Sequence, residues 1–170
     1  MRSIKWTTSN AVFVTEIDDE HKEIFDAVLD LQNLLGGPGP WPELSKVTRH
    51  LVSSIDEHFT HEERLMRAAR YDLLRWHKRS HDGARKRVAQ VIARIEQGDA
   101  KAARELVEYL TAWLHAHTAL ADRMMGAFLR NHRRSMWKMT FQAGTKPLDS
   151  CTWVTSKGDV FQSQAGKRKA

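Results

Sequence analysis

Two pairs of potential metal-binding side chains, separated by a short turn, constrain the fold of this 170-residue chain more than any other feature. His58 and Glu62 stand four residues apart, and so do His77 and His81. On an α-helix, residues four apart lie on one face about one turn from each other. The segment 68–72 between the pairs is long enough to reverse the chain. We therefore expect two antiparallel helices, each of which directs two ligand atoms toward the same point.

Amphipathic periodicity extends this pair of helices to an all-α fold. Apolar residues at helical spacing predict four helices, at about residues 19–35, 41–66, 72–97 and 100–130. The breaks are Gly36-Gly37-Pro38-Gly39-Pro40, a turn in which Asp72 is the expected N-cap, and Gly98-Asp99. Helices joined by short breaks predict an up-down-up-down four-helix bundle. Residues 1–18 should form an extended N-terminal arm with four apolar anchors to the core: Trp6, Val12, Val14 and Ile17.

The charge distribution sets the end of the chain apart. Residues 131–170 hold 8 Lys and Arg but only 2 Asp and Glu, whereas residues 1–130 hold 19 of each kind. The net charge of +6 therefore comes from the end of the chain alone. A uniformly basic domain would suggest nucleic acid, and a neutral domain with a basic tail suggests it much less. We predict a bundle domain over residues 1–130 and a basic C-terminal extension over residues 131–170, with no nucleic acid as a partner.

The extension itself carries few structural signals. Lys157-Gly158-Asp159, between Cys151–Val154 and Val160–Phe161, predicts a small β-hairpin, and residues 166–170 are expected to be disordered. Its interleaved aromatic and basic residues are a candidate surface for nucleic acid or lipid, but a solvated extension is the simpler interpretation. They are Trp137, Lys138, Phe141 and Trp153. A protein partner, if the chain has one, would bind there.

Cysteine content and hydropathy bear on the compartment. Cys151 is the single cysteine, so no internal disulfide can form and a reducing compartment is expected. The first ten residues lack the apolar run of a signal peptide, and no stretch approaches the length of a membrane span. We expect a cytoplasmic protein.

Ionisable side chains lie on the apolar stripes of all four predicted helices, where burial without a partner is costly. In chain order, they are His21, His58, Glu62, His77, His81 and His117. One histidine on an apolar stripe is usually a core residue, but this combination indicates a metal centre. Asp122 follows the last of them by five residues, about 140° round an ideal helix, and would join the set only from the stripe's edge or through a π-bulge. The histidines off the stripes are interpreted as surface residues: His50, His61, His115 and His132.

These motifs together resemble the signature of the hemerythrin family, and of single-domain bacteriohemerythrins in particular. The matching segments are Ile17-Asp18-Asp19-Glu20-His21, HFTHEERLM at 58–66, His77-x3-His81, and WLHAHTALAD at 113–122. The similarity covers about residues 5–130 and implies reversible O2 binding at a non-haem di-iron centre. Carried over by motif, it implies that three residues bind one iron: His77, His81 and His117. It also implies that His21 and His58 bind the other, while Glu62, Asp122 and a solvent-derived oxo or hydroxo group bridge the two.

In this arrangement the second iron has one imidazole fewer and keeps an open position, as a reactive metal requires. The ligand types suit iron, although zinc or manganese could bind the same set. The resemblance also implies an O2 pocket lined at the matching positions by Ile24, Phe59, Trp113, Leu114 and Thr118. Thr118 departs from the bulky aliphatic residue common in the family, and we expect its hydroxyl to admit water to the pocket wall.

Two other functions stay open at this point. A di-iron oxidase or oxygenase of the ferritin-like kind uses Glu-x-x-His motifs, and no Glu in this chain has a His three residues later. The second alternative is a sensing module that reports O2 or redox state through the extension. The histidine-rich, carboxylate-poor set favours reversible O2 binding over generation of a strongly oxidising iron, so we do not expect an enzyme. We also expect a monomer. O2 storage, delivery, sensing and iron handling are all compatible with such a site.

Overall fold

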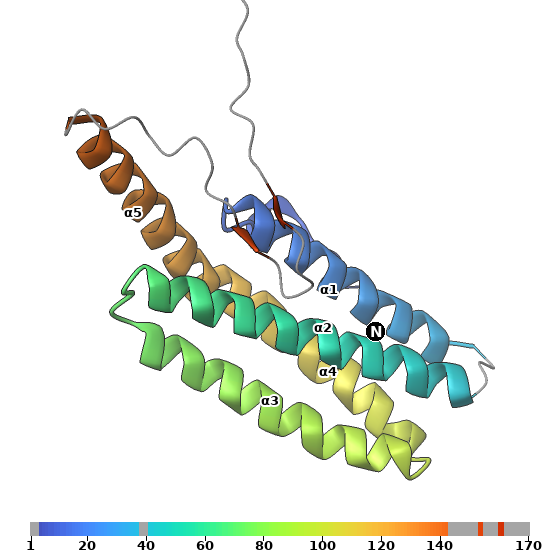
Figure 1. Cartoon of the computed structure of the whole chain (residues 1–170). Helices are drawn as coiled ribbons and strands as arrows, with labels where there is room; N and C mark the ends of the chain where they lie inside the picture. The colour runs from blue at the N-terminus through green and yellow to red at the C-terminus, as the bar shows by residue number, and fades with distance from the viewer. Residues whose placement is uncertain (1–3, 38–40, 143–152, 155–159, 162–170) are drawn as a thin grey trace, which may run out of the picture. The chain divides into compact units, whose positions relative to one another are not determined.

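The computed structural model describes residues 4–37, 41–142, 153–154 and 160–161. Four helical rods form the bundle: α1 (Thr15–Leu35), α2 (Trp41–Ala68), α3 (Leu74–Glu96) and a fourth that begins with α4 (Ala100–His117). α2 packs against α1 and α3, and α4 packs against α3 and α1, which closes the bundle (Figure 1). Short connections make successive helices antiparallel. The predicted up-down-up-down four-helix bundle is therefore confirmed.

The fourth rod contains a π-helical turn. η2 (Thr118–Asp122) lies between α4 and α5 (Arg123–Gln142) without interrupting the helix. The helix predicted to end near Arg130 continues to Gln142. Residues 131–142 contain no Gly or Pro that would stop it.

Two predicted helix starts are wrong. α1 begins at Thr15 rather than Asp19, because Asp18 lies inside the first turn. From there its carboxylate accepts hydrogen bonds from the backbone N–H groups of Val12, at 2.8 Å, and Phe13, at 2.9 Å, and ties the arm to the helix.

α3 begins at Leu74 with Leu73 as its N-cap, so Asp72 is not the cap. Arg70, at a φ of 54°, reverses the chain instead, and the N–H of Tyr71 closes α2 by donating to the carbonyl of Met66 at 2.9 Å. The third break follows the prediction. Gly98 has a φ of 88°, and the side chain of Asp99 accepts from the first backbone N–H groups of α4.

The bundle interior holds two apolar clusters. The larger one runs between the four helices, and the smaller one lies where the arm joins α1. The predicted arm anchors Val12, Val14 and Ile17 are buried in the smaller cluster, and Trp6 packs against the larger one. On α1, α3 and the fourth helix the predicted metal ligands fall between residues of the two clusters; on α2 Glu62 does so, and His58 directly precedes Phe59 of the larger cluster. The site is therefore a polar layer enclosed by apolar side chains at both ends.

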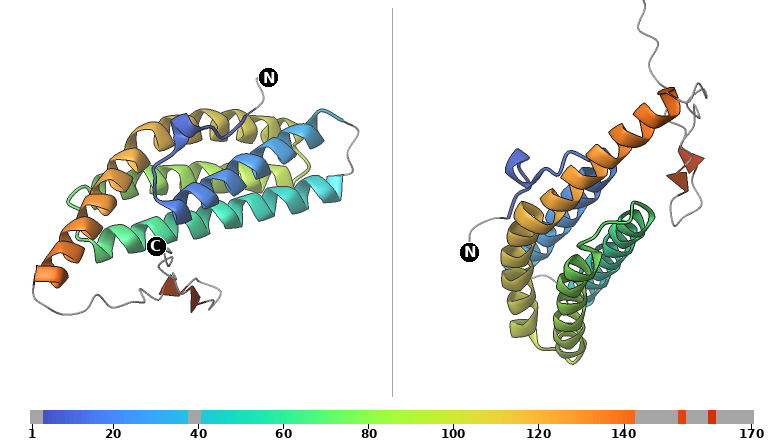
Figure 2. Two further views of the ribbon diagram at one scale, coloured as in Figure 1. Left: turned by 90° about the horizontal axis from the view of Figure 1, so that it is seen from above. Right: turned by 90° about the vertical axis from the view of Figure 1, so that its left-hand side faces the viewer.

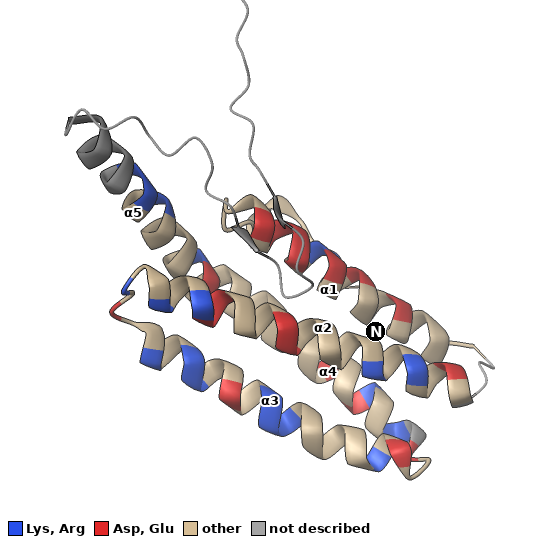
Figure 3. Ribbon diagram, viewed as in Figure 1, with Lys and Arg blue, Asp and Glu red and all other residues tan. Residues whose placement is uncertain are grey.

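Both charge signs appear on the outside of the bundle. Figure 3 shows acidic residues along α1, and Lys and Arg near the end of α2 and the start of α3. This distribution agrees with the balanced charge of residues 1–130 rather than with a uniformly basic domain. Within the described part of the chain, no helix combines the length and the apolar character needed to cross a membrane.

The chain divides into two compact units, residues 1–130 and 131–170. In the second unit, β1 (Trp153–Val154) and β2 (Val160–Phe161) pair antiparallel, with Trp153 opposite Phe161. The predicted hairpin turn at 157–159 and the end predicted to be disordered lie outside the described residues. The assignment of the extension as a separate domain stays a prediction.

Candidate metal centre

All seven predicted metal ligands lie in one buried cluster inside the bundle. In chain order they come from α1 (His21), α2 (His58, Glu62), α3 (His77, His81), the end of α4 (His117) and the end of η2 (Asp122). The most exposed of them, His117, has only 6% of its surface open to solvent. Every helix of the bundle therefore contributes to a single site.

Three imidazoles form one side of the cluster. The Nε2 atoms of His77, His81 and His117 each lie 3.1 Å from the other two. Two ligands at right angles around a metal ion at ~2.1 Å would lie about 3.0 Å apart. The triangle of nitrogens therefore fits three mutually perpendicular ligands of one ion.

The two carboxylate oxygens of Glu62 face different histidines: Oε2 faces the three-imidazole side, and Oε1 faces His58 on the opposite side. Its Oε2 lies 3.4 Å from Nε2 of His77 and 3.3 Å from Nε2 of His81. Its Oε1 faces His58 instead, at 3.7 Å from Nε2. The carboxylate thus spans two groups of imidazoles.

Asp122 does the same from the other side of the bundle. Its Oδ1 lies 3.0 Å from Nε2 of His117 and 3.1 Å from that of His77, and its Oδ2 lies 3.2 Å from Nε2 of His21. The π-helical turn makes this possible, because i→i+5 bonding brings residues five apart to about one turn from each other. Of the two routes into the site that the sequence left open for Asp122, the stripe's edge or a π-bulge, the structure contains the π-bulge.

Several of these atoms have no hydrogen-bond partner of adequate geometry among the described residues, although the distances are short. They are both side-chain oxygens of Glu62 and Asp122 and both ring nitrogens of His21. Buried polar atoms are nearly always paired, so such a set of inward lone pairs needs a further partner. A pair of metal ions fits this donor set.

The carboxylates and imidazoles shift each other's pKa values in the metal-free protein. Burial alone would lower the pKa of His77, but the close Asp122 and Glu62 carboxylates outweigh burial and raise the pKa to about 9. Burial and the neighbouring Asp122 would raise the pKa of Glu62, yet the surrounding histidines hold it well below its usual range. Asp122 is also buried, and the adjacent rings of His117, His21 and His77 lower its pKa. In the metal-free protein the cluster therefore binds protons that a metal must displace.

Glu20 and His61 belong to the surroundings of the site, although no role was predicted for Glu20 and His61 was predicted to be a surface residue. Nδ1 of His58 donates to Glu20 at 2.8 Å, and Nδ1 of His61 lies 2.6 Å from the other oxygen of Glu20. Burial opposes ionisation of Glu20, but these two histidines lower its pKa to about 2. His61 is half-buried as a result.

Two further outer partners were missed. Glu63 accepts from Nδ1 of His81 at 3.3 Å, and Arg85 holds the same Glu63 oxygen at 2.7 Å. Ser80 lies 3.1 Å from Nδ1 of His117. Such contacts fix the tautomer that leaves Nε2 free to bind a metal. Their position directly beside predicted ligands in the chain was the only signal that could have found them.

Four of the five predicted pocket residues are buried in the bundle, and Trp113 is half-buried against the larger cluster. The ring of Phe59 stacks on His81 at 4.0 Å, and that of Trp113 stacks on His117 at 4.1 Å. Ile24 and Leu114 are buried in the larger cluster. Thr118 is buried too, but its hydroxyl accepts a hydrogen bond from the arm at 2.9 Å. A role for any of them in an O2 pocket stays a prediction.

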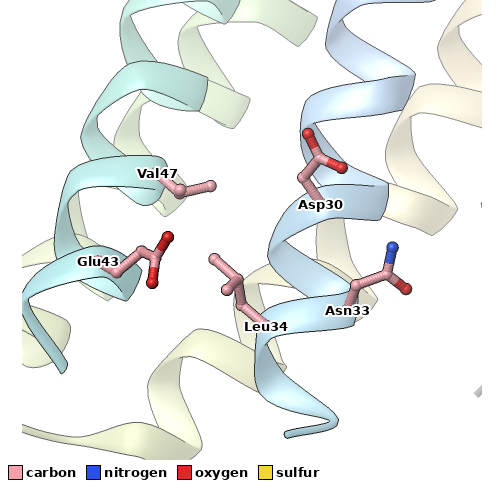
Figure 4. Close-up of a pocket in the computed structure, with 5 residues that line it drawn as sticks. All are labelled: Asp30, Asn33, Leu34, Glu43 and Val47. Carbon is pink, nitrogen blue, oxygen red and sulfur yellow. The ribbon is translucent and has the colours of Figure 1, made fainter. Parts of the chain in front are cut away.

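A surface pocket of about 380 Å³ between α1 and α2 is separate from this site. Figure 4 shows its lining, which is Asp30, Asn33, Leu34, Glu43 and Val47. Asp30 lies about 13 Å along α1 from the ligand His21. None of the predicted site residues lines this pocket.

A family model, curated relatives and a solved structure that resemble this chain all belong to one family. Residues 12–129 match the family model described as the hemerythrin HHE cation binding domain. Myohemerythrin of Theromyzon tessulatum is 31% identical over 118 residues, which cover 69% of this chain and 87% of that protein. Bacteriohemerythrin of Methylococcus capsulatus is 29% identical over 132 residues, or 76% of this chain and 98% of that protein. A crystal structure of wild-type hemerythrin aligns with a TM-score of 0.70 at 27% identity, covering 75% of this chain and 98% of its own.

Proposed function

The chain belongs to the hemerythrin family, and on that premise we propose that it binds O2 reversibly at a non-haem di-iron centre held by the seven clustered residues. In this proposal one iron would be held by His77, His81 and His117. His21 and His58 would hold the other iron, and Glu62 and Asp122 would each offer one carboxylate oxygen to either ion.

The division of the two carboxylates carries the proposal. Each directs one oxygen toward the three-imidazole side and the other toward the two-imidazole side. One side therefore has one donor fewer than the other, and an ion there keeps an open position. A di-ferrous centre bound in this way would supply two electrons and one open coordination position for O2.

The surrounding residues have three tasks in this function. Glu20, Glu63 and Ser80 hold the imidazole rings so that Nε2 points inward. Phe59 and Trp113 cover two of the rings and exclude water from them. Before metal binds, the histidines lower the pKa values of the two carboxylates, so both are ionised at neutral pH and ready to bind a cation.

The same composition supports a carrier rather than an enzyme. Five histidines and two carboxylates form a site poorer in carboxylate than the Glu-x-x-His centres of di-iron oxidases. We further propose that the protein acts as a monomer in the cytoplasm, and that any protein partner binds through residues 131–170.

The test is anaerobic loading with Fe²⁺, followed by iron analysis and optical spectra before O2, after O2 and after O2 is removed. We expect two irons per chain and an absorption band that appears with O2 and disappears without it. His58→Ala should abolish the band, whereas His50→Ala, which removes an exposed histidine of the same helix, should leave it unchanged. A band that forms but cannot be reversed, with O2 consumed, would instead assign an oxidase.

A further inference from the structure

The N-terminal arm lies against the π-helical turn that carries Asp122. η1 (Thr8–Asn10) is a short 3-10 turn of the arm and packs against η2, although more than 100 residues separate them in the chain. Figure 2 shows this N-terminal segment beside the fourth helical rod in both views. The arm therefore contacts the fourth helix at η2, where it departs from α-helical geometry.

Asn10 is the centre of the contact. It is 3% exposed, and its Nδ2 donates to Oγ1 of Thr118 at 2.9 Å, with Nδ1 of His115 at 3.3 Å as a second neighbour. Its Oδ1 accepts from the backbone N–H of Thr7 at 3.3 Å. Both ends of the buried amide are thus used, one by the arm and the other by the first residue of η2.

The arm is also held just beyond η2. Arg123, the first residue after the turn, donates from Nη2 to the carbonyl of Ser9 at 2.8 Å, and Arg130 donates to the carbonyl of Val12. At Gly126 the arm backbone lies so close that an added Cβ would come within 2.5 Å of the carbonyl oxygen of Val12. The arm therefore runs along η2 and the start of α5 with no room between them.

A π-helical turn needs support of this kind, because i→i+5 turns are rare and the chain would otherwise return to α-helix. In the regular helix Asp122 would point about 140° away from His117 rather than into the site. We propose that the arm clamps η2, and that Asn10 is a positioning residue which acts through Thr118 to hold the Asp122 carboxylate between the two groups of imidazoles. The part of this inference that concerns metal rests on the proposed function.

The clamp also explains what the Thr118 hydroxyl does. An aliphatic residue at this position would remove the nearer acceptor of the buried Asn10 amide and leave only Nδ1 of His115 at 3.3 Å, and a poorly paired buried donor is costly. The Thr118 hydroxyl therefore acts as the hydrogen-bond acceptor that holds Asn10 of the arm.

The test compares Asn10→Ala with Thr8→Ala, which changes an exposed residue of the same turn, in the full chain. Hydrogen exchange of the η2 amides in the metal-free protein measures the clamp directly. Release of Fe²⁺ to bipyridine from the loaded protein measures its effect on the site. We expect both to become about tenfold faster in Asn10→Ala and to stay unchanged in Thr8→Ala. Thr118→Val should behave like Asn10→Ala, and the double variant should be no worse than either single one.

Equal exchange in Asn10→Ala and Thr8→Ala would overturn the clamp. Faster exchange with unchanged iron release would overturn the positioning role, because the arm would then stabilise the helix without reaching Asp122. Wild-type protein that binds no iron would contradict the proposed function instead, and the exchange data would still decide on the clamp.

Discussion

At the residue scale, the two carboxylates of the site decide the chemistry. Glu62 and Asp122 are fully buried, no Lys or Arg pairs with them among the described residues, and their neighbours are imidazoles. Fixed cations would have neutralised them permanently. Imidazoles instead leave the negative charge available to a metal whenever the rings are neutral.

The first prediction follows from the position of Glu62 between two groups of histidines. Glu62→Ala should lose both irons rather than one, because the residue that bridges two ions holds each of them. Iron analysis after gel filtration measures this. Glu57→Ala, an exposed position on the same helix, is the control and should keep its iron. Two irons in Glu62→Ala would show that Glu62 is not a bridge.

At the element scale, the helix ends and the π-turn set the directions of the ligands. The α3–α4 connection depends on Gly98, whose φ of 88° an L-residue adopts only with strain. Gly83 is the opposite case, a glycine within α3 with no atom near its Cα that a side chain would meet. Because a Cβ would meet no atom within 4 Å at either glycine, the pair isolates the effect of backbone conformation.

Replacement of each by alanine gives a matched pair. Gly98→Ala should lower the free energy of unfolding by about 1 kcal/mol through left-handed strain. Gly83→Ala should raise it by about 0.5–1 kcal/mol, because alanine loses less entropy in a helix. Urea unfolding of the metal-free protein measures both. A destabilised Gly83→Ala would reveal a contact of α3 at that position.

At the scale of the whole molecule, stability and metal binding depend on the protonation of one buried layer. In the metal-free protein the pKa of His77 is raised to about 9, so its stabilising contribution is complete below about 6.5 and is lost as the pH rises through 9. The pKa values of the carboxylates are lowered, so their contributions are lost only in acid. Burial lowers the pKa of His81, so protonation of this ring opposes folding only below about pH 6.5. His81 therefore does not change the stability between about pH 6.5 and 9.

The melting temperature of the metal-free protein should therefore fall between about pH 6.5 and 9. His77→Gln should remove much of this fall, because His77 is the histidine whose pKa is raised to about 9, whereas His58, whose pKa is also raised above 6.5, still titrates in the variant. Thermal unfolding across this range, with the iron-loaded protein as a second control, measures it. A melting temperature that stays constant or rises toward pH 9 would contradict the charged pairing of His77.

The division at residue 130 leads to the last prediction. All seven site residues lie before it, so a chain that ends at Arg134 should bind iron and O2 as the full chain does. The cut falls within α5, and helix content by circular dichroism should decrease only slightly. Failure of this shorter chain to hold iron would show that the bundle needs residues beyond Arg134.

Sequence by itself determined the helices, their order and six of the seven candidate ligands. Helical periodicity is a local property, so residues four apart on one face, such as His77 and His81, can be recognised without knowing their neighbours. Gly98 and Asp99 were predictable for the same reason, since a left-handed residue followed by an N-cap needs only the adjacent backbone.

Tertiary structure decided what depends on distant parts of the chain. Asp122 enters the site only because η2 is a π-turn, and Asn10 supports that turn from 108 residues away. Glu20 and Glu63 hold histidines of other helices, and their partners follow from how the helices are rotated against each other. α1 starts early because Asp18 binds the arm, which no helix propensity predicts. Periodicity specifies which face of a helix is buried, whereas packing specifies which side chains meet there.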